Sequence, residues 1–446
     1  MSAFFDPQDK KNKPILDYFE NKSWLVVENS ASTRTSIKKS IVQLGSKMSN
    51  MTDADNLVDA QKCIETKKPH YIIGNKNING GSIITLYECH LKTMPNRLSS
   101  GFFIITEENA LNEVALALEY EMDGIITLPF TGASIIDSLL DGSKHKVAPS
   151  AYLKKCDEAR SAYYKGNEEL AEQLLQASLP LHKHPYEAFF LLGQIYSNQN
   201  ALEKAVKAYE DSIFHNSEYF RPLNKLSSLY YQMKEYKKAY DMSFLLAQKF
   251  PTPPDKIPDL IRLSIINQRY EDINNYLKIF KEFREPDKST QISLSAGLAV
   301  LGKYFFQHND HVKGEEALRG AFEFSNGKYE ILSNLLSTSE EFNKLPLLNE
   351  LFESVDLDQW NETVSGLSFY TFHKTSEDDG QVLAQGEQLL KKKVKEFHIY
   401  IGLIERGIKI KRKIGNIESL VLEGIKEFPE HKDKFDGLFL LAQNNQ

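Results

Sequence analysis

Three polar side chains follow short apolar runs of the sequence, at positions where a strand would end. In the segment YIIGNKNINGG (71–81) an apolar run ends at Asn75 and passes into a polar, glycine-containing stretch. Glu28 ends the run WLVVE, and Thr106 ends the run GFFIIT. In many α/β folds the residue at such a strand end carries the chemistry, and an acid there would be typical. Position 75 holds an amide instead, so the sequence raises the question of what this site does without the acid.

Amphipathic segments alternate with these apolar runs between residue 23 and about residue 140. The expected strands are 24–28, 70–74, 101–106 and 124–128, with a weaker one near 46–51. The expected helices are 33–44, 56–67, 82–90, 109–120 and 133–140. This alternation predicts a doubly wound α/β domain, in which a five-stranded parallel sheet has helices on both faces. The carboxyl ends of its strands would bring Glu28, Asn75 and Thr106 to one crevice.

From residue 151 onward the strand signals stop and the sequence repeats itself every 34 residues. Two sets of small residues keep this spacing: Ala171, Ala205 and Ala239, and Ala159, Gly193 and Ser227. A fixed period with small residues where two helices touch indicates an all-α superhelical solenoid. The clearest units span 151–284, and 285–446 holds degenerate units and a cap, with no fixed register over 329–395. The fourth unit has Ile261 and Ile273 where small residues belong.

The motifs LGQIY and AVKAY, followed by the closing Phe250–Pro251, give this half a family likeness. It resembles tetratricopeptide repeats, in which the first helix of each repeat lines a concave face. By register that face carries Arg160, Tyr163, Phe190, Gln194, Asn198, Arg221, Asn224, Ser228 and Tyr231. Aromatic, amide and Arg side chains are typical of recognition surfaces, so we expect a protein or peptide partner in this groove. Leu191 stands where the peptide-clamping members need Asn, so their ligand is not predicted.

Four motifs of the first half form one frame. VVENSASTRTSIKKSIVQLG (26–45) begins its polar part with Glu28 and Asn29, PHYIIGN ends in Asn75, FIIT ends in Thr106, and Leu128 precedes a Pro–Phe pair. This frame, over about residues 23–140, resembles the receiver domain of two-component response regulators. The resemblance implies two acids at positions 28 and 29, a phospho-accepting Asp at 75, Thr or Ser at 106, and Lys at 128.

Phosphoryl transfer to a receiver needs a carboxylate nucleophile, Mg²⁺ and a cation beside the phosphoryl oxygens. Asn75 carries an uncharged carboxamide, which is a very poor nucleophile. Mg²⁺ usually takes one or two carboxylates, and only Glu28 is left to serve. Leu128 removes the cation that would stabilise transferred charge. We therefore expect a degenerate pseudo-receiver that keeps the fold without phosphorylation, and that needs no cofactor or metal.

The composition and the remaining motifs exclude several classes of protein. The net charge of −7 does not favour nucleic acid as a partner, and no run of eighteen apolar residues indicates a membrane span. The N-terminal segment lacks the apolar core of a secretory signal. Cys63, Cys89 and Cys156 are scattered without a CxxC motif, as is typical of reduced thiols in a cytoplasmic protein. No enzyme motif stands in a suitable context.

The expected organisation is a flexible leader over 1–22, the pseudo-receiver over 23–140, a linker over 141–150 and the repeat domain over 151–446. Together these parts predict a non-enzymatic bacterial signalling adapter, with a place in a motility or polarity complex as an analogy of fold. The pseudo-receiver would dock through its fourth helix, fifth strand and fifth helix. Two alternatives stay open: a phosphorelay regulator with the repeats as output domain, and a small-ligand sensor that uses the crevice. Trp24 opens the first strand and is expected to report on that crevice.

Overall fold

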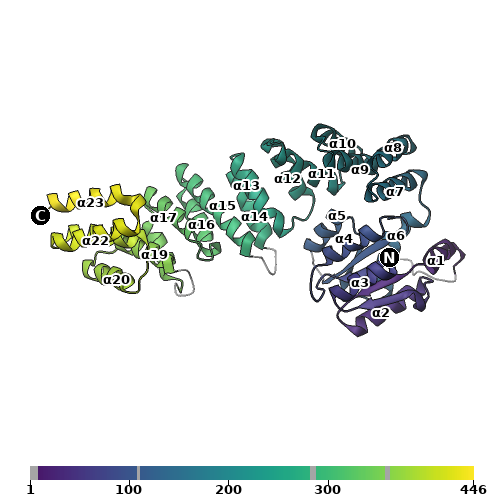
Figure 1. Ribbon diagram of the computed structural model, residues 1–446, viewed down its shortest axis with the longest axis horizontal. Coiled ribbons are helices and arrows are strands. Elements are labelled where there is room, and N and C mark those ends of the chain that lie inside the picture. The colour runs from purple at the N-terminus through teal and green to yellow at the C-terminus, as the bar shows by residue number, and fades with distance from the viewer. Residues whose placement is uncertain (1–8, 108–110, 282–287, 357–361, 446) are drawn as a thin grey trace. The chain divides into compact units, whose positions relative to one another are not determined.

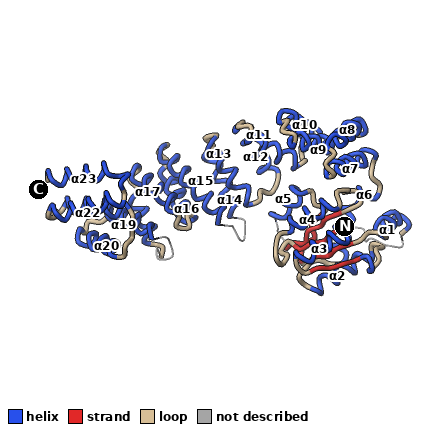
Figure 2. Tube along the Cα trace, in the orientation of Figure 1, coloured by secondary structure: helices blue, strands red, loops and turns tan. Residues whose placement is uncertain are grey.

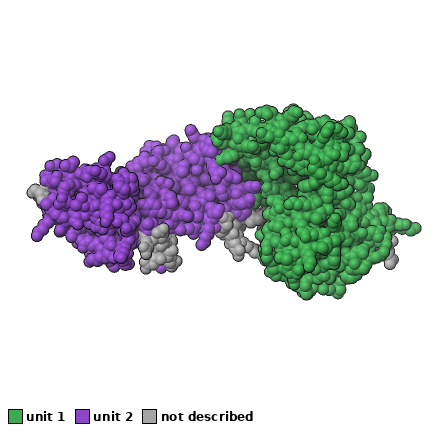
Figure 3. All heavy atoms as spheres, in the orientation of Figure 1, with its two compact units in different colours: residues 1–253 green, residues 254–446 purple. Residues whose placement is uncertain are grey.

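A computed structural model describes residues 9–107, 111–281, 288–356 and 362–445 of the chain (Figure 1). The chain divides into two compact units, Met1–Pro253 and Pro254–Gln446 (Figure 3). Within the described ranges, no helix combines the length and the apolar character that a membrane crossing requires.

A five-stranded parallel sheet forms the core of the first 150 residues (Figure 2). Its strands are β1 (Trp24–Val27), β2 (Met51–Ala54), β3 (Tyr71–Asn75), β4 (Gly101–Glu107) and β5 (Gly124–Leu128), in the order β2-β1-β3-β4-β5. The order reverses direction at β1, which pairs with β2 on one side and β3 on the other. The predicted doubly wound sheet is therefore confirmed, with its switch point between β1 and β3.

Helices cover both faces of the sheet, which explains why its strands read as continuous apolar runs. The helices are α2 (Ala31–Gln43), α3 (Leu57–Lys67), α4 (Ile83–Thr93), α5 (Leu111–Tyr120) and α6 (Gly132–Val147). Leu25 and Ile72 belong to the core against α3, α4 and α5, while Val26 and Ile73 belong to the core against α2 and α6. Successive strand residues thus feed opposite cores, as the pleat requires.

The expectations of a flexible leader over 1–22 and a linker over 141–150 are wrong for most of their described residues, which lie in helices. Helix α1 (Lys13–Glu20) packs on the sheet, and its Phe19 is buried against Trp24 with ring centroids 5.6 Å apart. Residues 1–8 of the leader lie outside the described residues. Helix α6 runs to Val147, so only 148–150 connect it to α7 (Ala151–Tyr164). The end of α6 is polar in sequence and was therefore predicted to be a linker. Its residue Lys146 is nevertheless buried, because it forms an ion pair with Asp123.

Three helix pairs complete the first unit. They are α7 with α8 (Glu168–Ser178), α9 (Tyr186–Asn198) with α10 (Leu202–His215), and α11 (Phe220–Gln232) with α12 (Tyr236–Lys249). The predicted small residues lie where the paired helices meet: Ala171, Ala205 and Ala239 are wholly buried. A Cβ atom at Gly193 would lie 2.5 Å from the ring of Tyr209. The 34-residue period therefore marks close helix packing, as expected.

The described part of the second unit consists of five helix pairs and a last helix. The pairs are α13 (Ile257–Ile266) with α14 (Ile273–Lys281), α15 (Lys288–Gln307) with α16 (His311–Phe324), α17 (Tyr329–Glu341) with α18 (Leu345–Glu353), α19 (Glu362–Thr375) with α20 (Asp379–Lys391), and α21 (Phe397–Lys409) with α22 (Ile414–Glu427); α23 (Lys432–Asn444) follows. Ile261 and Ile273 fit because a glycine stands opposite them: a Cβ at Gly297 would lie 2.7 Å from a methyl carbon of Ile261.

Candidate functional site

The switch point of the sheet brings the two central residues of the crevice into contact. Val27 pairs with Gly74, so Glu28 and Asn75 follow at neighbouring strand ends. The Asn75 Nδ2 group donates a hydrogen bond of 2.6 Å to Glu28 Oε2, and the Ser30 N–H donates to Glu28 Oε1 over 3.1 Å. Both carboxylate oxygens of Glu28, which is buried, are therefore bonded within the chain. The Asn75 carbonyl oxygen accepts from the Asn77 N–H at 2.8 Å.

The loop after β1 is tied to its surroundings by Asn29 and Arg34. Asn29 Nδ2 donates to the Asn77 carbonyl over 3.0 Å, which joins this loop to the one that follows β3. Arg34 donates to the carbonyl oxygens of Glu28 and Asn29 and pairs with Asp53 at 3.1 Å. Asn29 thus stands where an acid was implied, and it serves as a hydrogen-bond donor between loops.

Thr106 and Leu128 complete the set of five predicted crevice positions. Thr106 pairs with Thr127, and Glu107 pairs with Leu128, so both residues lie at the same edge of the sheet as Asn75. Thr106 is buried, and Leu128 packs with the core that covers the other side of the strand. The structure therefore gathers all five positions at one edge.

A cation at this edge was missed from the sequence. Lys76 directly follows Asn75, and its ammonium group pairs with the buried carboxylate of Glu113 in α5. The signal was a Lys in the loop after the strand, but its partner lies in another helix. Among the described side chains, no group of three or more His, Cys, Asp or Glu residues is arranged to bind a metal ion. The Glu28 oxygens and the Lys76 ammonium are therefore both bonded within the chain.

Trp24 lies at the other edge of the sheet, so the expectation that it reports on the crevice is wrong. It occupies the amino-terminal end of β1, and its Nε1 donates to Ser46 Oγ over 2.9 Å. A strand rises by about 3.3 Å per residue, so the first residue of β1 lies about 13 Å along the strand from Glu28 at the carboxyl edge.

The nine predicted groove residues divide into three groups. Arg160, Arg221 and Asn224 contact acidic groups of the receiver-like domain, as detailed below. Phe190 is wholly buried among the repeats, so its placement on an open surface is corrected: its ring packs against Tyr209 and Tyr219. The remaining five are Tyr163, Gln194, Asn198, Ser228 and Tyr231, and their contact with a partner stays a prediction. Among these, the Asn198 amide donates to the Tyr163 hydroxyl, and Tyr231 is exposed.

The end of α5 and the turn after it lie against the first and third repeats. Arg221 forms an ion pair with the carboxylate of Glu121, and Arg160 Nη2 lies 3.6 Å from the same carboxylate. Asn224 Nδ2 donates to Glu119 Oε1 over 3.0 Å. Burial by itself raises the pKa of Glu121, but Arg221 and Arg160 outweigh burial and hold that pKa below its usual range. Helix α5 is the fourth helix of the expected pseudo-receiver. Part of the face that was expected to dock a partner is therefore in contact with the repeats of the same chain.

Comparisons with known proteins find likenesses to solved structures at low sequence identity. No protein-family model matches the sequence, and no curated protein matches it. Among solved structures, a signal receiver domain described as part of a LuxO repressor from Vibrio parahaemolyticus shares 17% identity over 28% of this chain and 92% of that chain, with a TM-score of 0.25. A tetratricopeptide repeat protein from Parabacteroides merdae shares 14% identity over 66% of this chain and 98% of that chain, with a TM-score of 0.30.

Yeast Tom70 also shares 14% identity, over 66% of this chain and 76% of that chain, with a TM-score of 0.27. The similarities are of fold alone. The strand order, the crevice frame and the helix pairs described above make this chain a receiver-like α/β domain followed by a tetratricopeptide-like solenoid.

Proposed function

We propose that this protein is a non-enzymatic signalling adapter, in which a pseudo-receiver that works without phosphorylation is coupled to a protein-binding superhelix. One observation carries the proposal: the amide of Asn75 donates to the carboxylate of Glu28 at 2.6 Å, in the position of the phospho-accepting group. An amide in that place has no charge to attack phosphorus, and it occupies the oxygen that Mg²⁺ would need.

The surroundings of this contact support the proposal. Leu128 supplies no positive charge at the end of β5, and the ammonium of Lys76 is paired with Glu113. A transferred phosphoryl group would therefore lack the cation that stabilises its charge. Two carboxylates at this distance would repel each other, so an amide also favours the folded domain at neutral pH.

The repeats supply the binding half of the proposal. Solenoids of stacked helix pairs present extended surfaces to other proteins, and the protein partner is assigned on that ground. A bacterial origin, a cytoplasmic location and a role in a motility or polarity complex remain predictions from the sequence.

Intact mass and hydrogen exchange test the proposal on the full chain. The protein is incubated with Mg²⁺ and acetyl phosphate or beryllofluoride, and the amides around Asn75 are followed. We expect no mass adduct and no change in exchange. The Asn75→Asp variant is the matched control, because it returns the carboxylate that the reaction needs.

A phosphoryl adduct on the wild-type chain would overturn the proposal. It would favour the phosphorelay alternative, with another acid accepting the phosphoryl group. A small molecule retained in native mass spectrometry and lost after substitution of Asn75 would favour the ligand-sensor alternative.

A further inference from the structure

Two acidic residues of the receiver-like domain reach the repeats of the same unit. Glu119 lies in the last turn of α5, and Glu121 follows that helix. Glu121 has a φ of 53°, in the left-handed region where a side chain costs energy and glycine does not. From this turn the Glu121 carboxylate reaches Arg221 of the repeats.

The repeats receive these carboxylates with a prepared set of donors. Arg221 pairs with Glu121, and Asn224 donates to Glu119. The Arg221 guanidinium lies over the ring of Phe190, 4.3 Å from its centroid. Because Phe190 is wholly buried, this stacking fixes Arg221 independently of the acid that it holds.

The contact is close and leaves room for little water. A cavity of about 20 Å³ lies beside it, lined in part by Tyr87, Arg97 and Arg160, with room for about one water molecule. Nη1 of Arg97, a buried side chain, has no hydrogen-bond partner among the described residues. Arg160 of the repeats also pairs with Glu187 at 2.8 Å, so Arg221 and Asn224 are the donors that the repeats direct at the two acids of the receiver-like domain.

We infer that the concave face of the first three repeats is a groove for acidic protein segments, and that the receiver-like domain closes it with Glu119 and Glu121 until such a segment displaces them. The inference rests on the proposed function only in giving the groove a protein partner, because closure by the chain's own acids can be tested without one. The groove would select a segment with carboxylates spaced as in Glu119 and Glu121, since those are the groups it already holds.

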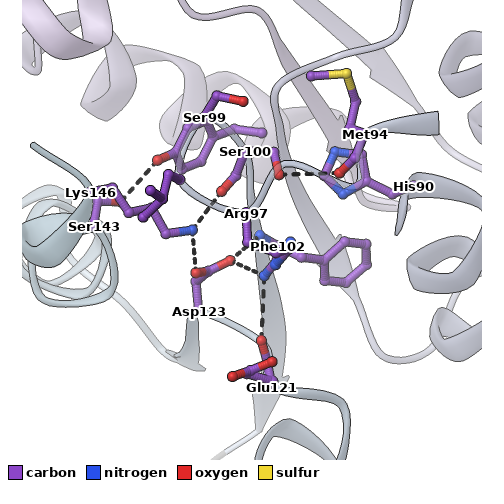
Figure 4. A network of polar contacts seen from close by, with 12 residues as sticks. His90, Met94, Arg97, Ser99, Ser100, Phe102, Glu121, Asp123, Ser143 and Lys146 are labelled. Atoms are coloured by element: carbon purple, nitrogen blue, oxygen red, sulfur yellow. Dashed lines mark hydrogen bonds and ion pairs between the residues drawn. The ribbon is translucent and has the colours of Figure 1, made fainter. Parts of the chain in front are cut away.

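A separate group of buried contacts would keep the two domains attached while the groove opens. Asp157 of α7 accepts from the N–H groups of Arg97, at 2.6 Å, and Leu98, at 3.3 Å. The Arg97 guanidinium in turn pairs with Asp123 at 2.5 Å and donates to the Glu121 carbonyl over 3.3 Å (Figure 4). These contacts do not involve the Glu119 and Glu121 side chains, so removing the two carboxylates leaves them in place.

The first experiment tests closure by hydrogen exchange on the full chain. The double variant Glu119→Gln and Glu121→Gln removes both charges and keeps the side-chain shapes. We expect the amides at the start of α11 and the end of α5 to exchange about tenfold faster, with the second unit unchanged. The matched control is Glu65→Gln with Glu88→Gln, which removes two exposed acids of the same domain. Equal exchange in the wild type and the Glu119/Glu121 variant would overturn the inference.

The second experiment asks whether the opened groove takes an acidic segment. The probe is the synthetic peptide LALEYEMDG (116–124) with a blocked carboxyl terminus, and its control carries Gln at both Glu positions. We expect the opened variant to bind the acidic probe at least about tenfold more tightly than the wild type, because the wild-type groove is occupied. The control peptide is expected to bind neither protein.

A charge exchange then locates the site. Arg221→Glu should abolish peptide binding, and adding Glu121→Arg to it should return slow exchange by restoring the pair in reverse. If the Glu119/Glu121 variant opens but binds no acidic probe, the groove assignment fails while the pseudo-receiver proposal stands. A phosphoryl adduct at the crevice would instead overturn the pseudo-receiver proposal and leave the closure of the groove unaffected.

Discussion

The two edges of the sheet in the receiver-like domain, where its strands end and where they begin, differ in the partners of their buried carboxylates. At the carboxyl edge, where the family keeps its acids, Glu28 meets the neutral amide of Asn75. At the amino edge, Asp123 pairs with both Arg97 and Lys146 (Figure 4), and no more than 8% of any of these three side chains is exposed. The carboxyl edge thus pairs a carboxylate with an amide at its centre, whereas the amino edge, where the domain meets the repeats, holds buried ion pairs.

The motifs that resemble a receiver and the most deeply buried ion pairs therefore lie at opposite ends of one domain. Buried ion pairs recover only part of the cost of leaving water, but removing one partner leaves an uncompensated charge. The amino edge should therefore be sensitive to single changes, and the carboxyl edge should tolerate them. Substitutions at the two edges test this difference in sensitivity.

The largest effect is expected from Asp123→Asn at the amino edge. The change leaves the charges of Arg97 and Lys146 buried without their carboxylate, which should cost about 3–5 kcal/mol of unfolding free energy. Urea denaturation of the full chain, followed by hydrogen exchange in the first unit, measures it. Asp141→Asn is the control, since Asp141 is exposed and should change stability by less than about 0.5 kcal/mol. Similar values for both variants would remove the contrast between the edges.

Lys146 should give the amino edge a pH dependence in the alkaline range. Burial lowers the pKa of Lys146 to about 8, despite the opposing pull of Asp123. Between about pH 8 and 10.5 the unfolded chain then binds more protons at this residue, so its contribution to stability rises with pH.

Lys146→Met removes that titration. The difference in unfolding free energy between the wild type and this variant should move in favour of the wild type as pH is raised from 8 to 10, by about 1–2 kcal/mol. Denaturation curves at matched ionic strength measure it. A difference that stays constant over this range would contradict the expected burial of a charged Lys146.

At the carboxyl edge, Asn75→Asp is expected to cause a moderate loss of stability. A second carboxylate would face Glu28 and replace a donated hydrogen bond by repulsion, which should cost about 1–2 kcal/mol at neutral pH. The pair would bind a proton more tightly in the folded state, so the loss should grow as pH rises through the carboxyl range.

Thermal melts at pH 5 and pH 7.5, with and without Mg²⁺, measure this effect. Mg²⁺ should raise the melting temperature of the variant more than that of the wild type, because two carboxylates suit the ion. Asn77→Asp is a control for charge in the same loop. If the melting temperature of the Asn75→Asp variant depends on neither pH nor Mg²⁺, the side chains at positions 28 and 75 are not in contact.

The smallest effect is expected from Asn29→Ala. Its amide makes one exposed hydrogen bond to the Asn77 carbonyl, so the loss should be about 0.5 kcal/mol. Denaturation in urea beside the Asp123 variant gives the two ends of the scale. A loss of several kcal/mol would show that the carboxyl edge is as demanding as the amino edge.

The sequence alone determined the fold and the membership of the crevice. Continuous apolar runs placed the strands, because buried parallel strands need apolar residues on both faces, and the ends of those runs named Glu28, Asn75 and Thr106. The 34-residue spacing located the helix pairs, since helices can approach closely only where side chains are small. In both cases the information lies in short stretches of neighbouring residues.

The partners of the charged residues follow from the tertiary structure and not from the local sequence. Arg221 and Glu121 are 100 positions apart, and neither carries a local mark of its partner. Phe190 and Lys146 looked like a groove residue and a linker residue until packing buried them. Periodicity reports which face of an element is buried, whereas the partner of a single charge depends on how distant elements meet, and that is settled only when the chain has folded.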